Sequence, residues 1–230
     1  MDMSGTMCIC QDHTSNMQFQ EFFLEQDWVA AAVNILRSNS TQKIGLSGGS
    51  TPGLVYEAFA KSASPERAYT FVQIDERMVP PNHKDSNQKQ IKAALGSFLH
   101  TSSFITVPTE LSPASAACKY EEAIKNILPL DVAVLGIGPD GHTASLFPHS
   151  LALTSNALVT HTTTKQFAVE NRISLTFLAI MQSKQLLVLL RGKEKYAIVQ
   201  ALQMKQKTTE EFPAIKLLEH PNVHVLHLNA

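Results

Sequence analysis

The chain has 230 residues, with 19 Lys and Arg against 20 Asp and Glu and a formal net charge of −1. This balance excludes the basic field with which proteins hold a nucleic-acid backbone or an anionic membrane surface. With 44% hydrophobic and 17% charged residues, the composition is that of a folded core rather than a disordered segment. No stretch approaches the roughly 18 apolar residues that cross a bilayer. We expect one compact soluble domain over residues 1–230, with no nucleic-acid or membrane partner.

Apolar runs rich in β-branched residues alternate with helical patterns along the chain. In chain order these predict a helix at 28–37, a strand at 43–47, a helix at 52–61, a strand at 69–74, a helix at 87–95, a strand at 104–107, a helix at 113–128, strands at 131–136, 173–177 and 186–191, helices at 193–204 and 214–218, and a strand at 223–228. Such alternation predicts a single-domain, three-layer α/β/α fold with a mostly parallel central sheet.

The cysteine usage bears on redox compartment. Cys8, Cys10 and Cys118 cannot build a disulfide framework, and their odd number leaves at least one unpaired. No second cysteine pair follows Cys8 and Cys10, so we expect them in a first strand rather than in a metal site. The N-terminus shows neither the basic region nor the apolar stretch of a signal peptide. These features predict a reducing, cytoplasmic location.

Three polar segments each follow a predicted strand. They read LSGGSTP at 46–52, DER at 75–77 and GIGPDGH at 136–142. Because ligands bind beyond the carboxyl ends of strands in open parallel sheets, we expect the three segments to share one rim.

The first segment is typical of a strand, a tight turn and a helix start. Gly48 and Gly49 permit close backbone approach, Ser50 and Thr51 are common helix caps, and Pro52 suits the first helical turn. Free N–H groups at a helix N-terminus bind anions. No Lys follows at Walker spacing, so the segment is not a P-loop. Taken alone, it fits a phosphate site and an ordinary helix cap equally well.

Two motif matches in these segments are weak. The pattern G-x-S-x-G around Ser47 is that of the α/β-hydrolase nucleophile elbow, but only 46 residues precede it, too few for the strands and oxyanion loop required. The pattern G-x-G-x-x-G at 136–141 is that of a dinucleotide site, but no Asp or Glu lies between Gly141 and Val169 to bind a ribose. We expect instead a tight turn that projects Asp140 and His142 into a cleft.

The side chains on the predicted rim suit acid–base chemistry on an anionic ligand. His142 is a candidate general base near neutral pH. Asp75 is suited to orient a base or a sugar hydroxyl, and Arg77 to hold an anion or stabilise negative charge. Arg172 and Lys195 are candidate phosphate ligands. Each residue alone also fits a structural ion pair or a solvated charge, and the shared rim favours the functional interpretation.

The histidines near the C-terminus do not predict a metal site. His224 and His227 would point to opposite faces of a strand, so they would not converge on one ion with His220. We therefore assign no metal.

The motifs together resemble the 6-phosphogluconolactonase family, within a wider group that includes glucosamine-6-phosphate deaminase. The resemblance is carried by LSGGSTP at 46–52, DERMVP at 75–80 with SN at 86–87, and GIGPDGHTASLFP at 136–148, with weaker matches RISLT at 172–176, GKEK at 192–195 and FPA at 212–214. Deaminases have IAFNEP after the histidine and a DEY-type motif, so that activity is the second candidate. Family members often have a proline-rich stretch where this chain reads TKQFAVEN at 164–171.

The resemblance implies a glucosamine-6-phosphate deaminase-like fold and hydrolysis of 6-phospho-D-glucono-1,5-lactone to 6-phospho-D-gluconate, in the oxidative pentose phosphate pathway. It implies no organic cofactor and no obligatory metal. His142 would activate water, with Asp75 and Arg77 beside the reacting end. The implied substrate-binding residues, which include the phosphate ligands, are Ser47, Gly48, Gly49, Ser50, Thr51, Asn87, Arg172 and Lys195. We expect a monomer or small homo-oligomer, and a non-catalytic sugar-phosphate-binding protein remains an alternative.

Overall fold

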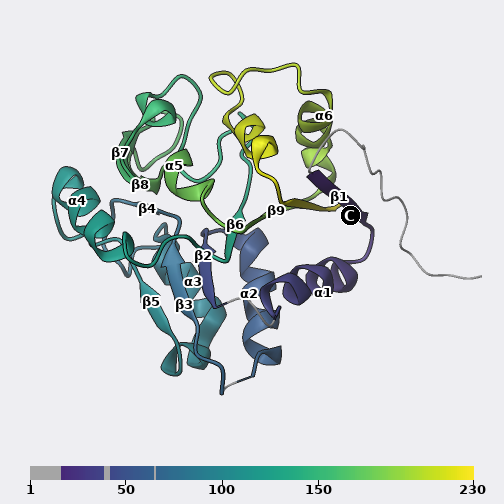
Figure 1. Ribbon diagram of the computed structural model, residues 1–230, viewed down its shortest axis with the longest axis horizontal. Coiled ribbons are helices and arrows are strands. Elements are labelled where there is room, and N and C mark those ends of the chain that lie inside the picture. Colours follow the sequence, from purple (N-terminus) through teal and green to yellow (C-terminus); the bar gives the residue numbers. More distant parts are fainter. Residues whose placement is uncertain (1–16, 39–41, 65) are drawn as a thin grey trace, which may run out of the picture.

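The computed structural model describes residues 17–38, 42–64 and 66–230, and a parallel sheet runs through its centre (Figure 1). The sheet has the strand order β1-β10-β9-β6-β2-β3-β5, and every neighbouring pair is parallel. Its strands are β1 (Met17–Phe22), β2 (Lys43–Leu46), β3 (Thr70–Gln73), β5 (Ser103–Ile105), β6 (Val132–Leu135), β9 (Gln185–Arg191) and β10 (Val223–Leu228). The predicted mostly parallel central sheet is confirmed.

Helices cover both faces of this sheet, which confirms the three layers (Figure 1). On one face lie α1 (Glu25–Leu36), α2 (Ser50–Ser62) and α3 (Asn87–Leu95); on the other lie α4 (Pro113–Ile124), α5 (Phe177–Ile180) and α6 (Tyr196–Met204). A hydrophobic core lies on each face of the sheet. Because side chains alternate across a strand, successive residues of one strand pack into one core and then the other. Val132 and Val134 of β6 pack in the core with α1–α3, and Ala133 and Leu135 pack in the other core.

A second, smaller sheet was not predicted. Its strands β4 (Asp75–Arg77), β8 (Asn171–Leu175) and β7 (Val159–Thr163) are antiparallel and pack among the residues of the second core. Residues 75–77, expected only as a polar segment after the strand at 69–74, form a strand of their own because they pair with β8. The strand predicted at 173–177 forms as β8, but it belongs to this sheet and ends where α5 begins. Strands β1 and β7 were not predicted.

Several predicted helix boundaries also need correction. The predicted caps Ser50 and Thr51 lie inside α2, which starts after Gly49 without a side-chain cap. Helix α4 ends at Ile124, four residues early, and α6 begins at Tyr196 after a 3₁₀ turn. The segment predicted as a helix at 214–218 is the 3₁₀ helix Pro213–Glu219.

Cys8 and Cys10 lie outside the described residues, so the predicted first strand around them is not tested. Cys118 is a free, exposed cysteine on α4. Within the described ranges, no helix combines the length and apolar character needed to cross a membrane.

Asp131 links the amino-terminal ends of neighbouring strands β2 and β6. One carboxylate oxygen, Oδ2, accepts hydrogen bonds from the N–H groups of Gln42 and Lys43, both at 2.8 Å, and Oδ1 lies 2.7 Å from Lys184 Nζ. Burial acts to raise the pKa of Asp131, but the hydrogen bonds from Lys184 and from the two backbone N–H groups outweigh it, and the pKa is lowered. A carboxyl whose pKa is lower in the folded than in the unfolded chain stabilises the fold above its unfolded pKa.

We therefore expect Asp131→Asn to destabilise the protein at pH 7 by about 1 kcal/mol, a fall of about 2–4 °C in Tm for a chain of this size. The difference from wild type should narrow as the pH falls below about 4, where the unfolded carboxyl becomes protonated, and should vanish only below the lower pKa of the folded carboxyl. Thermal unfolding at pH 7 and at pH 3.5 measures both effects. The exposed carboxylate variant Glu122→Gln is the control; a Tm gap for Asp131→Asn that does not depend on pH would contradict the linkage.

Candidate active site

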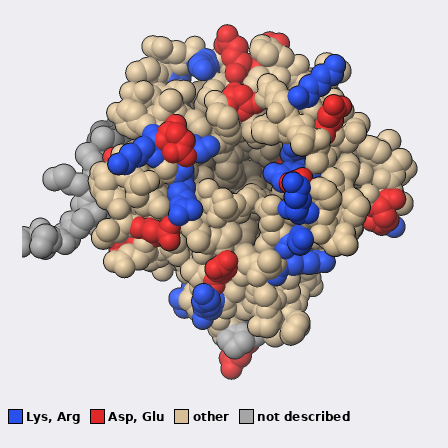
Figure 2. Space-filling model, turned by 180° about the vertical axis from the view of Figure 1, so that it is seen from behind, with Lys and Arg blue, Asp and Glu red and all other residues tan. Residues whose placement is uncertain are grey.

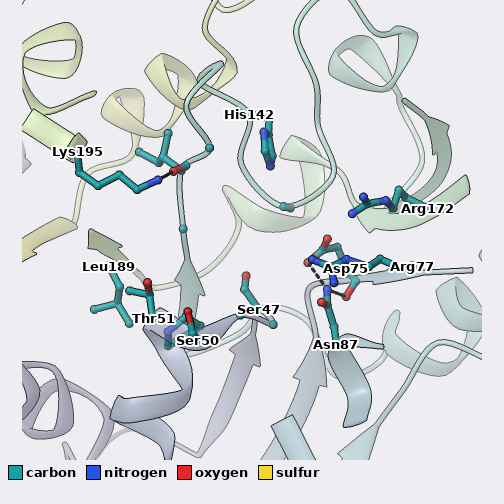
Figure 3. Close-up of a pocket in the computed structure, with 17 residues that line it drawn as sticks. Ser47, Ser50, Thr51, Asp75, Arg77, Asn87, His142, Arg172, Leu189 and Lys195 are labelled. Atoms are coloured by element: carbon teal, nitrogen blue, oxygen red, sulfur yellow. Dashed lines mark hydrogen bonds between the residues drawn. The ribbon is translucent and has the colours of Figure 1, made fainter. Parts of the chain in front are cut away.

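The residues selected from the sequence line one cavity of about 270 Å³ (Figure 3). They come from the end of β2 and the start of α2, from β4, from the start of α3, from the turn after β6, from β8 and from the turn after β9. The lining includes Ser47, Gly48, Gly49, Ser50, Thr51, Asp75, Arg77, Asn87, His142, Arg172 and Lys195. The parallel topology thus brings the three predicted segments to one rim.

The turn between β2 and α2 requires glycine at positions 48 and 49. Gly49, the N-cap of α2, has φ 116°, a conformation that residues with a side chain rarely adopt, and its N–H donates to Gln90 Oε1 at 2.8 Å. A Cβ on Gly48 would lie 2.2 Å from Asn87 Oδ1. The turn therefore places the first N–H groups of α2, those of Ser50 and Thr51, at the cavity without intrahelical acceptors. This end of the helix suits an anion.

Ser47 does not have the surroundings of a nucleophile. Its buried hydroxyl donates to the backbone carbonyl of Val134 at 2.8 Å, and its own carbonyl accepts a hydrogen bond from Tyr56 Oη at 3.0 Å. A nucleophilic serine instead needs a base within hydrogen-bond reach of its Oγ. The hydroxyl of Ser47 therefore holds the end of β2 against β6.

The fully buried carboxylate of Glu76 joins β3, β4 and the start of α3. It accepts five hydrogen bonds, from Gln73 Nε2 (2.7 Å), Ser86 Oγ (3.1 Å) and the N–H groups of Arg77 (2.7 Å), Asn87 (2.8 Å) and Gln88 (2.7 Å). Burial raises the pKa of Glu76, against the opposing effect of these hydrogen bonds. Glu76 lay inside a predicted site segment, but its positioning role was missed.

Asp75 and Asn87 form a fixed pair in one wall of the cavity (Figure 3). Asn87 Nδ2 donates to the backbone carbonyl of Asp75 at 3.0 Å and to Asp75 Oδ1 at 3.3 Å. Ser145 Oγ donates to Asp75 Oδ2 at 2.7 Å. Because both oxygens of the carboxylate accept hydrogen bonds, its orientation is set before any ligand binds.

Two arginines lie next to each other beside Asp75. Arg77 and Arg172 are direct partners in the antiparallel β4–β8 pair. Arg77 Nη1 donates to the carbonyl of Asp85 at 2.9 Å, and Arg172 Nε donates to the carbonyl of Val169 at 3.0 Å. Burial lowers the pKa of Arg172 below its ordinary value, while Asp75 opposes this shift. The guanidinium of Arg172 is thus partly desolvated, which strengthens its interaction with an anion.

His142 is oriented by Asp140. Its Nδ1 lies 2.5 Å from Asp140 Oδ1, and its backbone N–H donates to the same oxygen at 3.2 Å. A proton held on Nδ1 by this carboxylate leaves the lone pair on Nε2. The turn needs its glycines, since Gly141 has φ 84° and a Cβ on Gly138 would lie 2.1 Å from the imidazole. Asp140 was expected on the rim, but its pairing with His142 was missed although the i, i+2 spacing carries the signal.

The cationic groups lie on two sides of the cavity. Lys195 Nζ donates to the carbonyl of Ile137 at 2.9 Å. Figure 3 shows Lys195 on the same side as Ser50 and Thr51, and Arg172 and Arg77 with Asp75 on the opposite side. The face seen in Figure 2 is hollowed, and Lys and Arg side chains flank the hollow on two sides. Arg172 and Lys195, both predicted as phosphate ligands, are therefore separated across the cavity.

The three C-terminal histidines each have hydrogen-bond partners in the surrounding fold. His224 Nε2 lies 3.1 Å from Asn222 Oδ1, and burial lowers the pKa of this imidazole. His227 Nε2 lies 3.0 Å from the carbonyl of Gly192, and His220 Nε2 lies 2.7 Å from that of Ser183. In the part of the chain that the structure describes, no group of three or more His, Cys, Asp or Glu residues is arranged to hold a metal ion.

Comparison with known proteins agrees with the resemblance. The family model for "Glucosamine-6-phosphate isomerases/6-phosphogluconolactonase" matches residues 22–225. A protein of Dictyostelium discoideum named "Probable 6-phosphogluconolactonase" is 31% identical over 204 residues, which cover 84% of this chain and 86% of that one. The 6-phosphogluconolactonase of Thermotoga maritima is 39% identical over 153 residues, 65% of this chain and 69% of that one.

Solved structures agree in fold. A crystal structure of the 6-phosphogluconolactonase from Thermotoga maritima matches with a TM-score of 0.77 at 29% identity, covering 93% of this chain and 100% of that one. One from Shewanella baltica matches with a TM-score of 0.80 at 25% identity, covering 92% and 97%. The chain therefore belongs to the glucosamine-6-phosphate isomerase/6-phosphogluconolactonase family.

Proposed function

We propose that the protein is a 6-phosphogluconolactonase, which hydrolyses 6-phospho-D-glucono-1,5-lactone to 6-phospho-D-gluconate in the oxidative pentose phosphate pathway. The observation that carries the proposal is the cavity in which His142, oriented by Asp140, lies with cationic groups on two separate sides. Such a site suits a substrate with a phosphate at one end and a reactive carbonyl at the other. The proposal includes a cytoplasmic location and a monomer or small homo-oligomer.

The phosphate is assigned to the side formed by α2 and Lys195. The first N–H groups of α2 and the ammonium of Lys195 supply donors and positive charge there. Among the described residues that line the cavity, Asp75 is the only carboxylate, and it lies on the other side. A phosphate dianion next to Asp75 would meet like charge. Electrostatics therefore favours the phosphate beside Lys195.

The lactone carbonyl is assigned to the side of Asp75, Arg77 and Arg172. Negative charge develops on the carbonyl oxygen when water adds to the carbonyl carbon, and the product acid is again negative there once it has lost its proton to solvent. A desolvated guanidinium fixed before the reaction stabilises such charge more strongly than a mobile one in water. This assignment gives Arg172 a place at the reacting end, where the sequence alone indicated the phosphate. The fixed carboxylate of Asp75 is suited to accept a hydrogen bond from a hydroxyl group of the sugar ring.

His142 performs the proton transfers. Its Nε2 takes a proton from water as the water oxygen bonds to the lactone carbonyl carbon, and Asp140 stabilises the resulting imidazolium. The tetrahedral intermediate then collapses, the bond between the carbonyl carbon and the ring oxygen breaks, and His142 returns the proton to that oxygen. Phosphate binding on the far side positions the carbonyl for this sequence.

Replacement of the base tests the mechanism. We expect His142→Ala and His142→Gln to lower kcat by about 10²–10⁴-fold, the range that general-base catalysis contributes. The measurement is hydrolysis of freshly generated 6-phosphogluconolactone, corrected for its spontaneous rate. His149→Ala, which removes an imidazole 66% exposed, is the matched control and should keep wild-type turnover. A His142 variant that keeps near-wild-type kcat would refute this assignment.

The same assay separates the other activities. If folded wild-type protein does not accelerate lactone hydrolysis, the lactonase proposal fails, and ammonia release from glucosamine 6-phosphate tests the deaminase alternative. Thermal stabilisation by 6-phosphogluconate without turnover would identify a sugar-phosphate-binding protein. Labelling of Ser47 by a fluorophosphonate together with loss of activity would indicate a serine esterase instead.

The two cationic sides should separate kinetically. We expect Lys195→Ala to raise KM about 10–100-fold with little change in kcat, because it removes a charge-assisted contact to the non-reacting phosphate. We expect Arg172→Ala to lower kcat about 100-fold, because it removes stabilisation of charge that develops in the transition state. Lys193→Ala, at a neighbouring exposed lysine, is the control. Equal increases in KM for Lys195→Ala and Arg172→Ala, with kcat preserved, would place Arg172 on the phosphate.

A further inference from the structure

The loop between β7 and β8 brings an aromatic side chain to the active site. The N–H of Thr164 donates to the carbonyl of Glu170 at 3.1 Å, which ties the two ends of the loop together. Inside it, the N–H of Gln166 donates to Thr164 Oγ1 at 3.2 Å. Phe167 lies within this closed turn and is 38% exposed. The loop therefore has a defined shape of its own.

The ring of Phe167 contacts both chemical groups of the reacting end. Its centroid lies 5.6 Å from that of the His142 imidazole, with the two planes at 74°. Arg172 Cζ lies 5.4 Å from the Phe167 centroid and 5.9 Å from that of Phe147. The two phenyl rings are themselves 5.9 Å apart. Phe147 and Phe167 thus form an aromatic pair that contacts the Arg172 guanidinium and the catalytic imidazole.

The same loop also holds Arg172 through its backbone. The carbonyl of Val169 accepts the hydrogen bond from Arg172 Nε, at 3.0 Å. The hydrogen bond to Val169 fixes the position of the Arg172 guanidinium, and the ring of Phe167 restricts the orientation of the guanidinium plane. An exposed phenylalanine alone has no special meaning. A ring that touches the base and the cation of one site, on a loop that also bonds the cation, has a specific place in that site.

We propose that Phe167 is a positioning residue, whose π-face holds the Arg172 guanidinium in register with His142 at the reacting end of the cavity. This inference rests on the proposed lactone hydrolysis. Aromatic faces attract guanidinium groups, so the ring stabilises one orientation of Arg172.

The proposal predicts a specific kinetic pattern. We expect Phe167→Ala to lower kcat about tenfold, because a small misplacement of a charge-stabilising group costs rate. KM should stay within about twofold, since the phosphate contacts lie across the cavity. Phe167→Leu keeps apolar bulk without a π-face and should be as slow as Phe167→Ala. Phe167→Tyr and Phe167→Trp restore the π-face and should return kcat to within about threefold of wild type.

Steady-state kinetics of these four variants, beside Leu151→Ala as a control at a leucine 92% exposed, tests the proposal. Thermal unfolding of each variant shows that the fold is kept, as expected for a partly exposed site. In the Arg172→Ala background, Phe167→Ala should cost less than twofold, because a ring that acts through Arg172 has nothing left to position.

Two outcomes would overturn the proposal while the wild-type enzyme hydrolyses the lactone. One is full kcat in Phe167→Leu, which would reduce the ring to packing. The other is an undiminished effect of Phe167→Ala in the Arg172→Ala background. A wild-type protein without lactonase activity would instead be a failure of the proposed function, and the two failures are therefore distinguishable.

Discussion

The site depends on the buried carboxylate of Glu76. A fully buried charge is costly, and here it is offset by five donors and by its place at the N-terminus of α3. Because three of those donors are the N–H groups of Arg77, Asn87 and Gln88, the carboxylate fixes the backbone that carries two cavity residues. Burial nonetheless raises the pKa of Glu76, so keeping this carboxylate ionised lowers the free energy of unfolding. One wall of the cavity is thereby rigid and built on the sheet.

The opposite part of the site is built from turns, and contacts between residues close in the sequence hold its side chains in place. His142 owes its orientation to Asp140, two residues away, and to the absence of a side chain at Gly138. The rigid wall and the turns meet at Arg172, which pairs with Arg77 through the backbone and contacts Phe147 and Phe167 with its guanidinium. The alignment of His142, the proposed base, with Arg172, the proposed charge-stabilising group, therefore depends on contacts between segments distant in the sequence.

The sequence predicted the central sheet because its strands are apolar runs, and it predicted the shared rim because parallel strands end on the same edge. It could not reveal β4, since Asp75, Glu76 and Arg77 have no hydrophobic periodicity and form a strand only through pairing with β8. That pairing also decides on which side of the cavity Arg172 lies. The first four residues of β1, MQFQ, alternate between apolar and polar side chains, and this short signal was missed. Phe167 belongs to no motif, and only the fold shows what it touches.

A near-neutral chain can still be specific for an anion, because the charges that matter are few and local. Charges interact in solution over about 8 Å at physiological ionic strength, so the groups lining the cavity outweigh the net charge of the molecule. Among the described residues that line it, the charged side chains of Arg77, Arg172 and Lys195 are accompanied by one carboxylate, that of Asp75. The position of that carboxylate beside the arginines makes the cavity asymmetric, since it disfavours a dianion on one side only. In the proposed function, this asymmetry favours one orientation of a phosphorylated lactone, with its dianion beside Lys195 and its carbonyl toward the arginines.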